Sequence, residues 1–138
     1  DVNRLVLLAL YHDCSEILTG DMPTPIKYYN PEINDAYKKV EAVANEKLVS
    51  MLPEDLRGDY RPLLCHENED PELLRLLKAA DKLSALVKCI EEENAGNREF
   101  SKAKQSTMRA IEEMRLPEAD AFVAEFLPSY GLTVDELN

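Results

Sequence analysis

Hydrophobic residues recur at helical spacing along almost the whole chain, and no stretch of useful length alternates apolar and polar positions as a half-buried strand would. Residues 2–18 form the most apolar stretch, with apolar side chains nearly all round the expected helix, as is typical of a buried helix. Gly20 is expected to end it. The pattern predicts an all-α fold.

Helix start and stop signals divide the rest of the chain. Asn30-Pro31-Glu32 combines an N-cap, a proline at the first helical position and a first-turn acid, which predicts a helix to about residue 50. Asp70-Pro71-Glu72 repeats the signal and predicts a long helix to about residue 95, with Gly96 as its stop. A short helix is expected from Pro53 and Glu54, with a break near Pro62, and another over residues 98–115. One more is expected to start at Pro117 and to end before Pro128. The capping box from Thr133 to Glu136 predicts a terminal helical turn. Since no repeat or linker interrupts them, we expect one domain over residues 1–138.

The polar residues at the end of the first expected helix carry the main chemical signal. His12 and Asp13 are adjacent, and Glu16 follows at helical spacing from both. Imidazole and carboxylate groups are common ligands of first-row divalent metals. Neighbouring residues point about 100° apart on a helix, so His12 and Asp13 converge only at a distortion or a helix end. Taken alone, His12 is better explained as a half-buried histidine with satisfied hydrogen bonds.

A second carboxylate lies in the long helix after Pro71. One helical face passes through Leu74, Leu77 and Asp81, which predicts that Asp81 lies on or beside the buried face. A buried carboxylate without a partner is costly, and its small neighbours leave room for one. The alternative is an aspartate at the edge of the apolar stripe that pairs with a lysine.

The bulk composition limits the possible partners. The length of 138 residues and the 45% hydrophobic content fit one domain with a core. The net charge is −11. This charge opposes binding to a nucleic acid polymer but allows a small phosphate held through a metal. No apolar run is long enough to span a membrane. Three widely spaced cysteines favour a reducing, cytoplasmic compartment. Because the chain opens with Asp1 inside an expected helix, we expect upstream residues to be missing.

Three segments together resemble a known family. They are YHDCSEILTGDMPTPIKYYN, KAADKLSALVKCIEEENAGNREF and LPSYGLTVDEL. They resemble the HD-domain phosphohydrolases, and more closely the bacterial HD-domain deoxynucleoside 5′-monophosphatases. The resemblance implies a single HD-type helical bundle, incomplete at its N-terminus. It also implies an enzyme, a 5′-deoxynucleotidase, that converts deoxyribonucleoside 5′-monophosphates to deoxynucleosides and phosphate.

The resemblance also implies a site. One divalent metal ion, cobalt, manganese or similar, would be bound by His12, Asp13 and Asp81, with an upstream histidine that this chain lacks as the fourth ligand. Glu16 would be the catalytic acid/base or water-orienting group. Asp21 and Thr24 would contact the substrate, although both can also be explained as loop residues that cap their own backbone. The family further implies a homodimer.

Two other functions stay open from the sequence. The chain could be another HD phosphohydrolase, acting on a nucleoside triphosphate, a cyclic nucleotide or a guanosine polyphosphate, or a degenerate HD domain that serves as an interaction module. His66 is expected to be a loop residue. Cys14 and Cys89 are expected to be small core residues. The stripe of Phe122, Phe126 and Leu127 is expected to be either core or a subunit interface.

Overall fold

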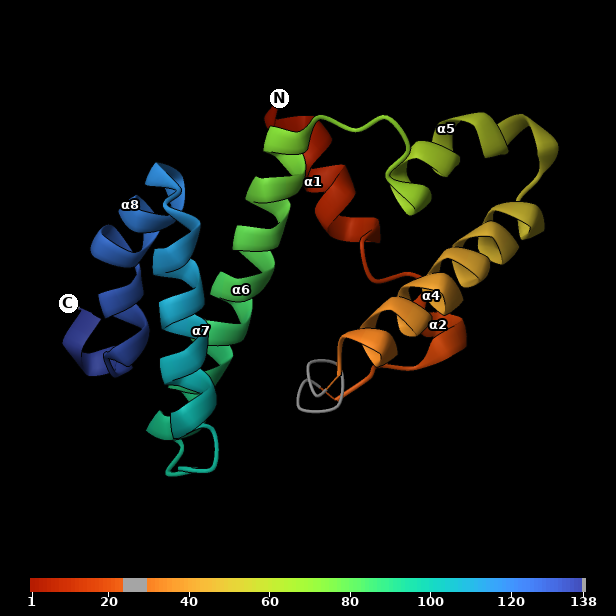
Figure 1. Cartoon of the computed structure of the whole chain (residues 1–138). Helices are drawn as coiled ribbons and strands as arrows, with labels where there is room; N and C mark the ends of the chain where they lie inside the picture. The colour runs from red at the N-terminus through yellow and green to blue at the C-terminus, as the bar shows by residue number, and fades with distance from the viewer. Residues whose placement is uncertain (24–29, 138) are drawn as a thin grey trace. The chain divides into compact units, whose positions relative to one another are not determined.

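The computed structural model describes residues 1–23 and 30–137, and its regular elements are all helices. No strand occurs in these two ranges, so the predicted all-α fold is confirmed. The elements, shown in Figure 1, are α1 (Val2–Tyr11), α2 (Glu16–Thr19), α4 (Pro31–Met51), α5 (Glu54–Cys65), α6 (Pro71–Asn94), α7 (Ser101–Met114), α8 (Pro117–Glu125), and the short 3-10 helices η1 (Leu127–Gly131) and η2 (Val134–Leu137).

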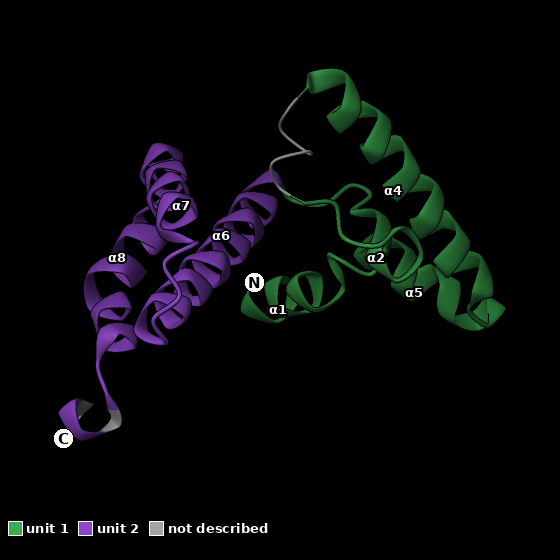
Figure 2. Cartoon of the chain, turned by 90° about the horizontal axis from the view of Figure 1, so that it is seen from below, with its two compact units in different colours: residues 1–70 green, residues 71–138 purple. Residues whose placement is uncertain are grey.

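The chain divides into two compact units, residues 1–70 and residues 71–138 (Figure 2). In the first unit, α4 packs against α2 and α5, and α1 packs mainly against α5. Leu8 of α1 is completely buried. The other buried hydrophobic residues of this unit come from α4 and α5, namely Tyr37, Ala44, Val49, Leu63 and Leu64.

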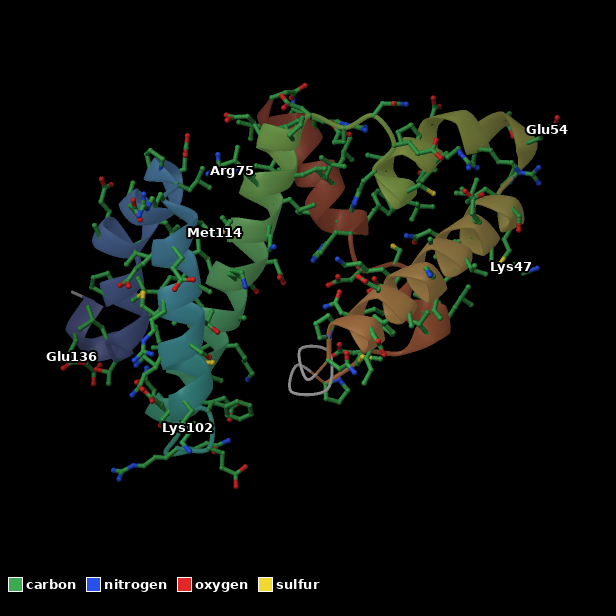
Figure 3. The ribbon with its side chains drawn as sticks, in the orientation of Figure 1. Lys47, Glu54, Arg75, Lys102, Met114 and Glu136 are labelled. Atoms are coloured by element: carbon green, nitrogen blue, oxygen red, sulfur yellow. The ribbon has the colours of Figure 1, made fainter. Side chains whose placement is uncertain are left out.

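The second unit is built on a hairpin of α6 and α7, against which α8 and η1 pack. Its core cluster draws on all of these elements and consists of Ala79, Leu86, Ile90, Ile111, Leu116, Ala119 and Leu127. At one end of the hairpin the Arg75 guanidinium donates a hydrogen bond to the Met114 carbonyl at 3.1 Å, and Figure 3 labels both residues. In this unit, α6, α7 and α8 follow one another in the sequence and are also neighbours in space.

The predicted helix boundaries are largely confirmed. The Asn30 side chain accepts a hydrogen bond from the Glu32 backbone N–H at 2.8 Å, which is the expected N-cap of α4. Gly96 has φ +88° just beyond α6, a conformation that glycine adopts without strain. At the last turn, the Glu136 carboxylate accepts hydrogen bonds from the N–H and the hydroxyl of Thr133, both at 2.8 Å.

The expectation of one buried helix over residues 2–18 was wrong in two respects. The helix ends at Tyr11, and a turn joins it to α2, where Glu16 N–H donates to the Asp13 carbonyl at 2.9 Å. In addition, Val2, Val6 and Leu10 are between 60% and 77% exposed. Within its own unit α1 packs mainly against α5, so only one face of the helix is covered.

Two further boundaries differ from expectation. Helix α5 continues through Pro62 to Cys65, because Leu63 and Leu64 just beyond the proline are buried and their packing holds the last turn. Helix α7 begins at Ser101 and not at residue 98. The backbone N–H of Asn97 still bonds the Glu92 carbonyl at 2.8 Å, so the chain is completing the end of α6 there.

Among the residues that the structure describes, no helix combines the length and apolar character needed to cross a membrane. Cys14, Cys65 and Cys89 are free thiols. Cys89 is buried and Cys14 is half-buried, so the expectation of a small core residue is met fully only for Cys89.

Candidate functional site

The turn after α1 brings together the two adjacent residues of the His-Asp pair. His12 Nε2 lies 3.0 Å from Asp13 Oδ2. Since α1 ends at Tyr11, the two side chains converge at a helix end, which is the condition that the sequence required. The His12 side chain is half-buried, while Asp13 is mostly exposed, so the pair borders the surface of the first unit.

The hydrogen bonding of His12 fixes the role of each ring nitrogen. Nδ1 lies 2.7 Å from the Ala9 carbonyl oxygen, and because a carbonyl only accepts, Nδ1 carries a proton. In the neutral ring, Nε2 then directs its lone pair towards the Asp13 carboxylate. Metal-binding histidines commonly donate their second nitrogen to a backbone carbonyl in this way. The arrangement therefore suits a cation shared by Nε2 and Oδ2.

The donor chemistry around this pair fits a divalent metal ion. Ligand atoms about 2.1 Å from one ion lie about 3 Å apart when the angle between them is near 90°, close to the observed separation. Within residues 1–23 and 30–137, no group of three or more histidine, cysteine, aspartate or glutamate side chains is gathered to hold an ion. His12 and Asp13 thus offer two suitable donor atoms in the first unit.

Glu16 and Asp21 follow within the same unit. Glu16 is the first residue of α2, is half-buried, and is tied to the turn by the bond of its N–H to the Asp13 carbonyl. Asp21 is exposed and comes directly after Gly20, whose φ of 71° and ψ of 165° suit glycine. The Tyr37 hydroxyl donates to the Gly20 carbonyl at 2.8 Å and so fixes the backbone before Asp21. Thr24 lies outside the described residues.

Asp81, predicted to lie on or beside the buried face of its helix, lies on α6 in the second unit but not on the buried face. Asp81 is exposed, while the core of this unit is lined by Ala79, Leu86 and Ile90. These residues follow a helical stripe different from the one through Leu74 and Asp81, because α7 and α8 cover that side of α6. An exposed carboxylate is accessible to a ligand without the desolvation cost that a buried one carries.

His66 is a second histidine of the first unit, and its charge interacts with that of His12. It lies in the loop after α5, as expected, with φ +52°. Its Nε2 is buried and has no hydrogen-bond partner among the described residues. Burial lowers the pKa of His66, and the charge of nearby His12 lowers it further. The two histidines thus influence each other electrostatically although they are far apart in the chain, and no sequence signal indicates this.

An ion pair lies beside these histidines. The Arg4 guanidinium donates two hydrogen bonds to one Glu69 carboxylate oxygen, through Nε at 2.9 Å and through a second nitrogen. The Glu69 side chain is only 8% exposed. The Arg4 hydrogen bond is the main reason that the pKa of Glu69 is lowered. This pair joins α1 to the end of the first unit.

The thiol nearest the turn is not activated. Burial raises the pKa of Cys14, and the negative charge of Asp13 raises it further. A thiol with a raised pKa is a poor nucleophile at neutral pH. The chemistry of this region therefore lies with its imidazole and carboxylate groups.

Comparison with known proteins gives the family. A model described as 5′-deoxynucleotidase YfbR-like matches residues 1–130. A 5′-deoxynucleotidase of Vibrio vulnificus (strain YJ016) is 47% identical over 138 residues, covering 100% of this chain and 71% of that protein. One from Vibrio cholerae serotype O1 is 49% identical over 135 residues, covering 98% and 70%. One from Yersinia pestis (strain Pestoides F) is 48% identical over 138 residues, covering 100% and 70%. The chain belongs to the YfbR-like 5′-deoxynucleotidase family.

Proposed function

We propose that this protein is a metal-dependent phosphomonoesterase that hydrolyses deoxyribonucleoside 5′-monophosphates to deoxynucleosides and phosphate. Family membership and the names of the relatives support this activity. The observation on the chain itself that carries the proposal is His12, with Nδ1 bonded to the Ala9 carbonyl and Nε2 facing Asp13 Oδ2. This arrangement prepares the imidazole to bind a cation.

The ligands that we assign to one divalent ion, cobalt, manganese or similar, are His12, Asp13 and Asp81. When bound, such an ion neutralises negative charge that develops on a phosphate and makes a bound water more acidic. The assignment of Asp81 rests on the family resemblance. The fourth ligand in the family is a histidine upstream of the residues present in this chain.

Glu16 is the group that we assign to the attacking water. Its backbone is held by Asp13, so its position depends on the turn that carries the metal ligands. In the reaction, the water oxygen forms a bond to phosphorus while the bond from phosphorus to the 5′-oxygen breaks. Glu16 accepts the proton that the water loses and returns it to the 5′-oxygen, which leaves as the hydroxyl of the deoxynucleoside.

Asp21 and Thr24 are the residues that we assign to the sugar and its surroundings. A carboxylate at Asp21 accepts a hydrogen bond from the 3′-hydroxyl of the substrate. Gly20 and the Tyr37 hydroxyl fix the backbone immediately before Asp21, which supports a precise placement of this group. Discrimination against ribonucleotides then requires that the other side of the sugar be crowded.

The test of the function is phosphate release from deoxyribonucleoside and ribonucleoside 5′-monophosphates, with manganese or cobalt added. We expect metal-dependent release that favours the deoxy substrates and is lost in Asp81→Ala. Bound metal without release from either substrate would point to another HD phosphohydrolase. Neither metal binding nor release would contradict the enzymatic proposal and favour an interaction module.

Replacement of Glu16 tests its role separately from metal binding. We expect Glu16→Ala to keep the metal affinity while kcat falls about 10³-fold, since general acid–base catalysis typically contributes this much. Glu16→Gln is the matched control, because it keeps the size and hydrogen bonding of the side chain but cannot accept the proton. A kcat within a few-fold of the wild type for Glu16→Gln would exclude the assigned role.

We further propose that the protein acts on a small nucleotide in the cytoplasm, as a homodimer, and that it binds neither a nucleic acid polymer nor a membrane. The net charge of −11 supports the exclusion of long nucleic acids. The free thiols are consistent with a reducing compartment.

A further inference from the structure

Tyr37 of α4 contacts the segment that carries two residues of the proposed site. That segment begins with Glu16, the first residue of α2, and ends with Asp21. Tyr37 is only 8% exposed, and its hydroxyl donates a hydrogen bond to the Gly20 carbonyl at 2.8 Å. Helix α2 lies beside α4, as Figure 1 shows. The contact therefore lies wholly within the first unit.

The Gly20 carbonyl oxygen accepts hydrogen bonds from two side chains. Thr19 Oγ1 also donates to it, at 3.0 Å, so both lone pairs of the oxygen are used. Thr19 precedes Gly20 in the chain and moves with it, whereas Tyr37 is seventeen residues away on another helix. The Tyr37 hydroxyl therefore ties the end of α2 to the 21-residue α4.

This hydrogen bond acts on Asp21 through the peptide plane. The Gly20 carbonyl and the Asp21 N–H belong to one planar peptide group, so holding the oxygen sets the direction in which the chain enters Asp21. Glycine needs such a restraint more than other residues, because without a Cβ it reaches many backbone conformations at little cost. At the other side of the residue, the Gly20 N–H donates to the Glu16 carbonyl at 2.9 Å. Together the bonds select one conformation among those open to Gly20.

We propose that Tyr37 is a positioning residue that sets substrate specificity. Its hydroxyl holds the Gly20–Asp21 peptide so that the Asp21 carboxylate meets the 3′-hydroxyl of the sugar. This inference rests on the proposed function, because it takes Asp21 as the sugar contact. Since Tyr37 acts through Asp21, its hydroxyl matters only for substrates that carry a 3′-hydroxyl. A merely structural role would affect all substrates equally.

The kinetics of Tyr37→Phe in the full chain test this role with two substrates. One is a 2′-deoxyribonucleoside 5′-monophosphate, and the other is its 2′,3′-dideoxy analogue, which lacks the 3′-hydroxyl. Phenylalanine keeps the ring and removes the hydroxyl. We expect KM for the deoxy substrate to rise about three- to tenfold, as the loss of one neutral hydrogen bond allows, while kcat changes little. KM for the dideoxy analogue should stay unchanged. An equal rise for both substrates would overturn the proposal.

Two further variants separate the proposed role from a general loss of stability. Tyr60→Phe is the matched control, because it removes a phenol hydroxyl from another tyrosine of the first unit, whose ring packs against Tyr11. It should leave the ratio of the two KM values unchanged. In an Asp21→Ala background, Tyr37→Phe should raise neither KM further, because the residue through which it acts is absent. Additive effects of the two changes would contradict the proposal.

The amide NMR signal of Asp21 separates this inference from the proposed activity. It reports the conformation of the Gly20–Asp21 peptide whether or not the protein turns over a substrate. We expect Tyr37→Phe to shift or broaden this signal, and Tyr60→Phe to leave it in place. A wild type that releases no phosphate would refute the proposed function and the specificity role together. An active wild type whose Asp21 signal is unchanged by Tyr37→Phe would overturn the positioning role alone.

Discussion

Gly20 shows how a single backbone conformation sets the position of a functional residue. Its φ of 71° and ψ of 165° fall in a region that is essentially restricted to glycine. A Cβ added there would meet no atom within 4 Å, so a substitution would be opposed by backbone strain and not by a clash. The residue that follows is Asp21, so the strain would be felt directly at the proposed sugar contact.

We therefore expect Gly20→Ala to destabilise the fold by about 1–3 kcal/mol and to raise KM for deoxyribonucleoside monophosphates. Thermal unfolding and steady-state kinetics measure the two effects. Gly58→Ala is the matched control, because Gly58 lies inside α5 with equally open space around it. Alanine favours a helix interior, so this control should gain about 0.5–1 kcal/mol. Equal effects of the two changes would contradict the argument.

The pair of Arg4 and Glu69 gives a pH-dependent contribution to stability. Arg4 lowers the pKa of Glu69 below its ordinary value, so the folded state favours the ionised carboxylate. The contribution is complete above the unfolded pKa of about 4.3 and is lost as the pH falls through the lower folded value.

We expect Arg4→Met to lower the free energy of unfolding at pH 7, with a difference from wild type that shrinks as the pH falls below about 4. Urea unfolding at a series of pH values measures this. Lys102→Met removes the same charge from an exposed position of α7 and should change stability little at either pH. A constant difference for Arg4→Met across the pH range would contradict the linkage to Glu69.

At the scale of helices, local signals proved more informative than the overall hydrophobic pattern. The Asn30-Pro31 and Gly96 signals located α4 and the end of α6, because caps act through atoms within a few residues. The break after Tyr11 and the continuity of α5 through Pro62 were missed. Both depend on which faces the other helices cover, and this information is not local.

The same limit applies to the candidate site. The His12 and Asp13 pair could be found from the sequence, since the two residues are adjacent and converge once the helix ends. The electrostatic interaction of His66 with His12 could not be predicted, because it depends on the packing of α1 against α5. For Asp81 the periodicity predicted one buried face of α6, and the positions of α7 and α8 bury a different one.

The end of α7 offers a stabilising change. Arg115 has φ +48° and ψ +53°, and its N–H bonds the Glu112 carbonyl at 3.1 Å. Because this left-handed conformation strains any residue with a Cβ, Arg115→Gly should stabilise the protein by about 1 kcal/mol, measured by thermal unfolding. Arg115→Ala keeps the Cβ and should bring no such gain. Equal stability of the two variants would contradict the assignment of strain.

For the whole molecule, the proposed metal ligands can be tested one residue at a time. His12 and Asp13 belong to residues 1–70, and Asp81 belongs to residues 71–138. If the ligand assignment is correct, His12→Ala and Asp81→Ala should each weaken manganese or cobalt binding at least about tenfold. Isothermal titration calorimetry measures this directly.

The matched control is Asp120→Ala, which removes an exposed carboxylate from α8 in the same unit as Asp81. Its affinity for the metal should equal that of the wild type. If Asp81→Ala binds metal as tightly as Asp120→Ala does, the ion is held by the first unit alone and the ligand set must be redrawn.

The packing of α1 against α5 also has a consequence during synthesis on the ribosome. Helix α1 is made early, with Leu8 destined for burial, but the α5 residues Leu63 and Leu64 emerge more than fifty positions later. At about 5–20 residues per second, translation leaves α1 without this partner for roughly 3–11 seconds. Its apolar residues are exposed to solvent or to chaperones throughout that interval. Slower translation between α1 and α5 would lengthen this interval.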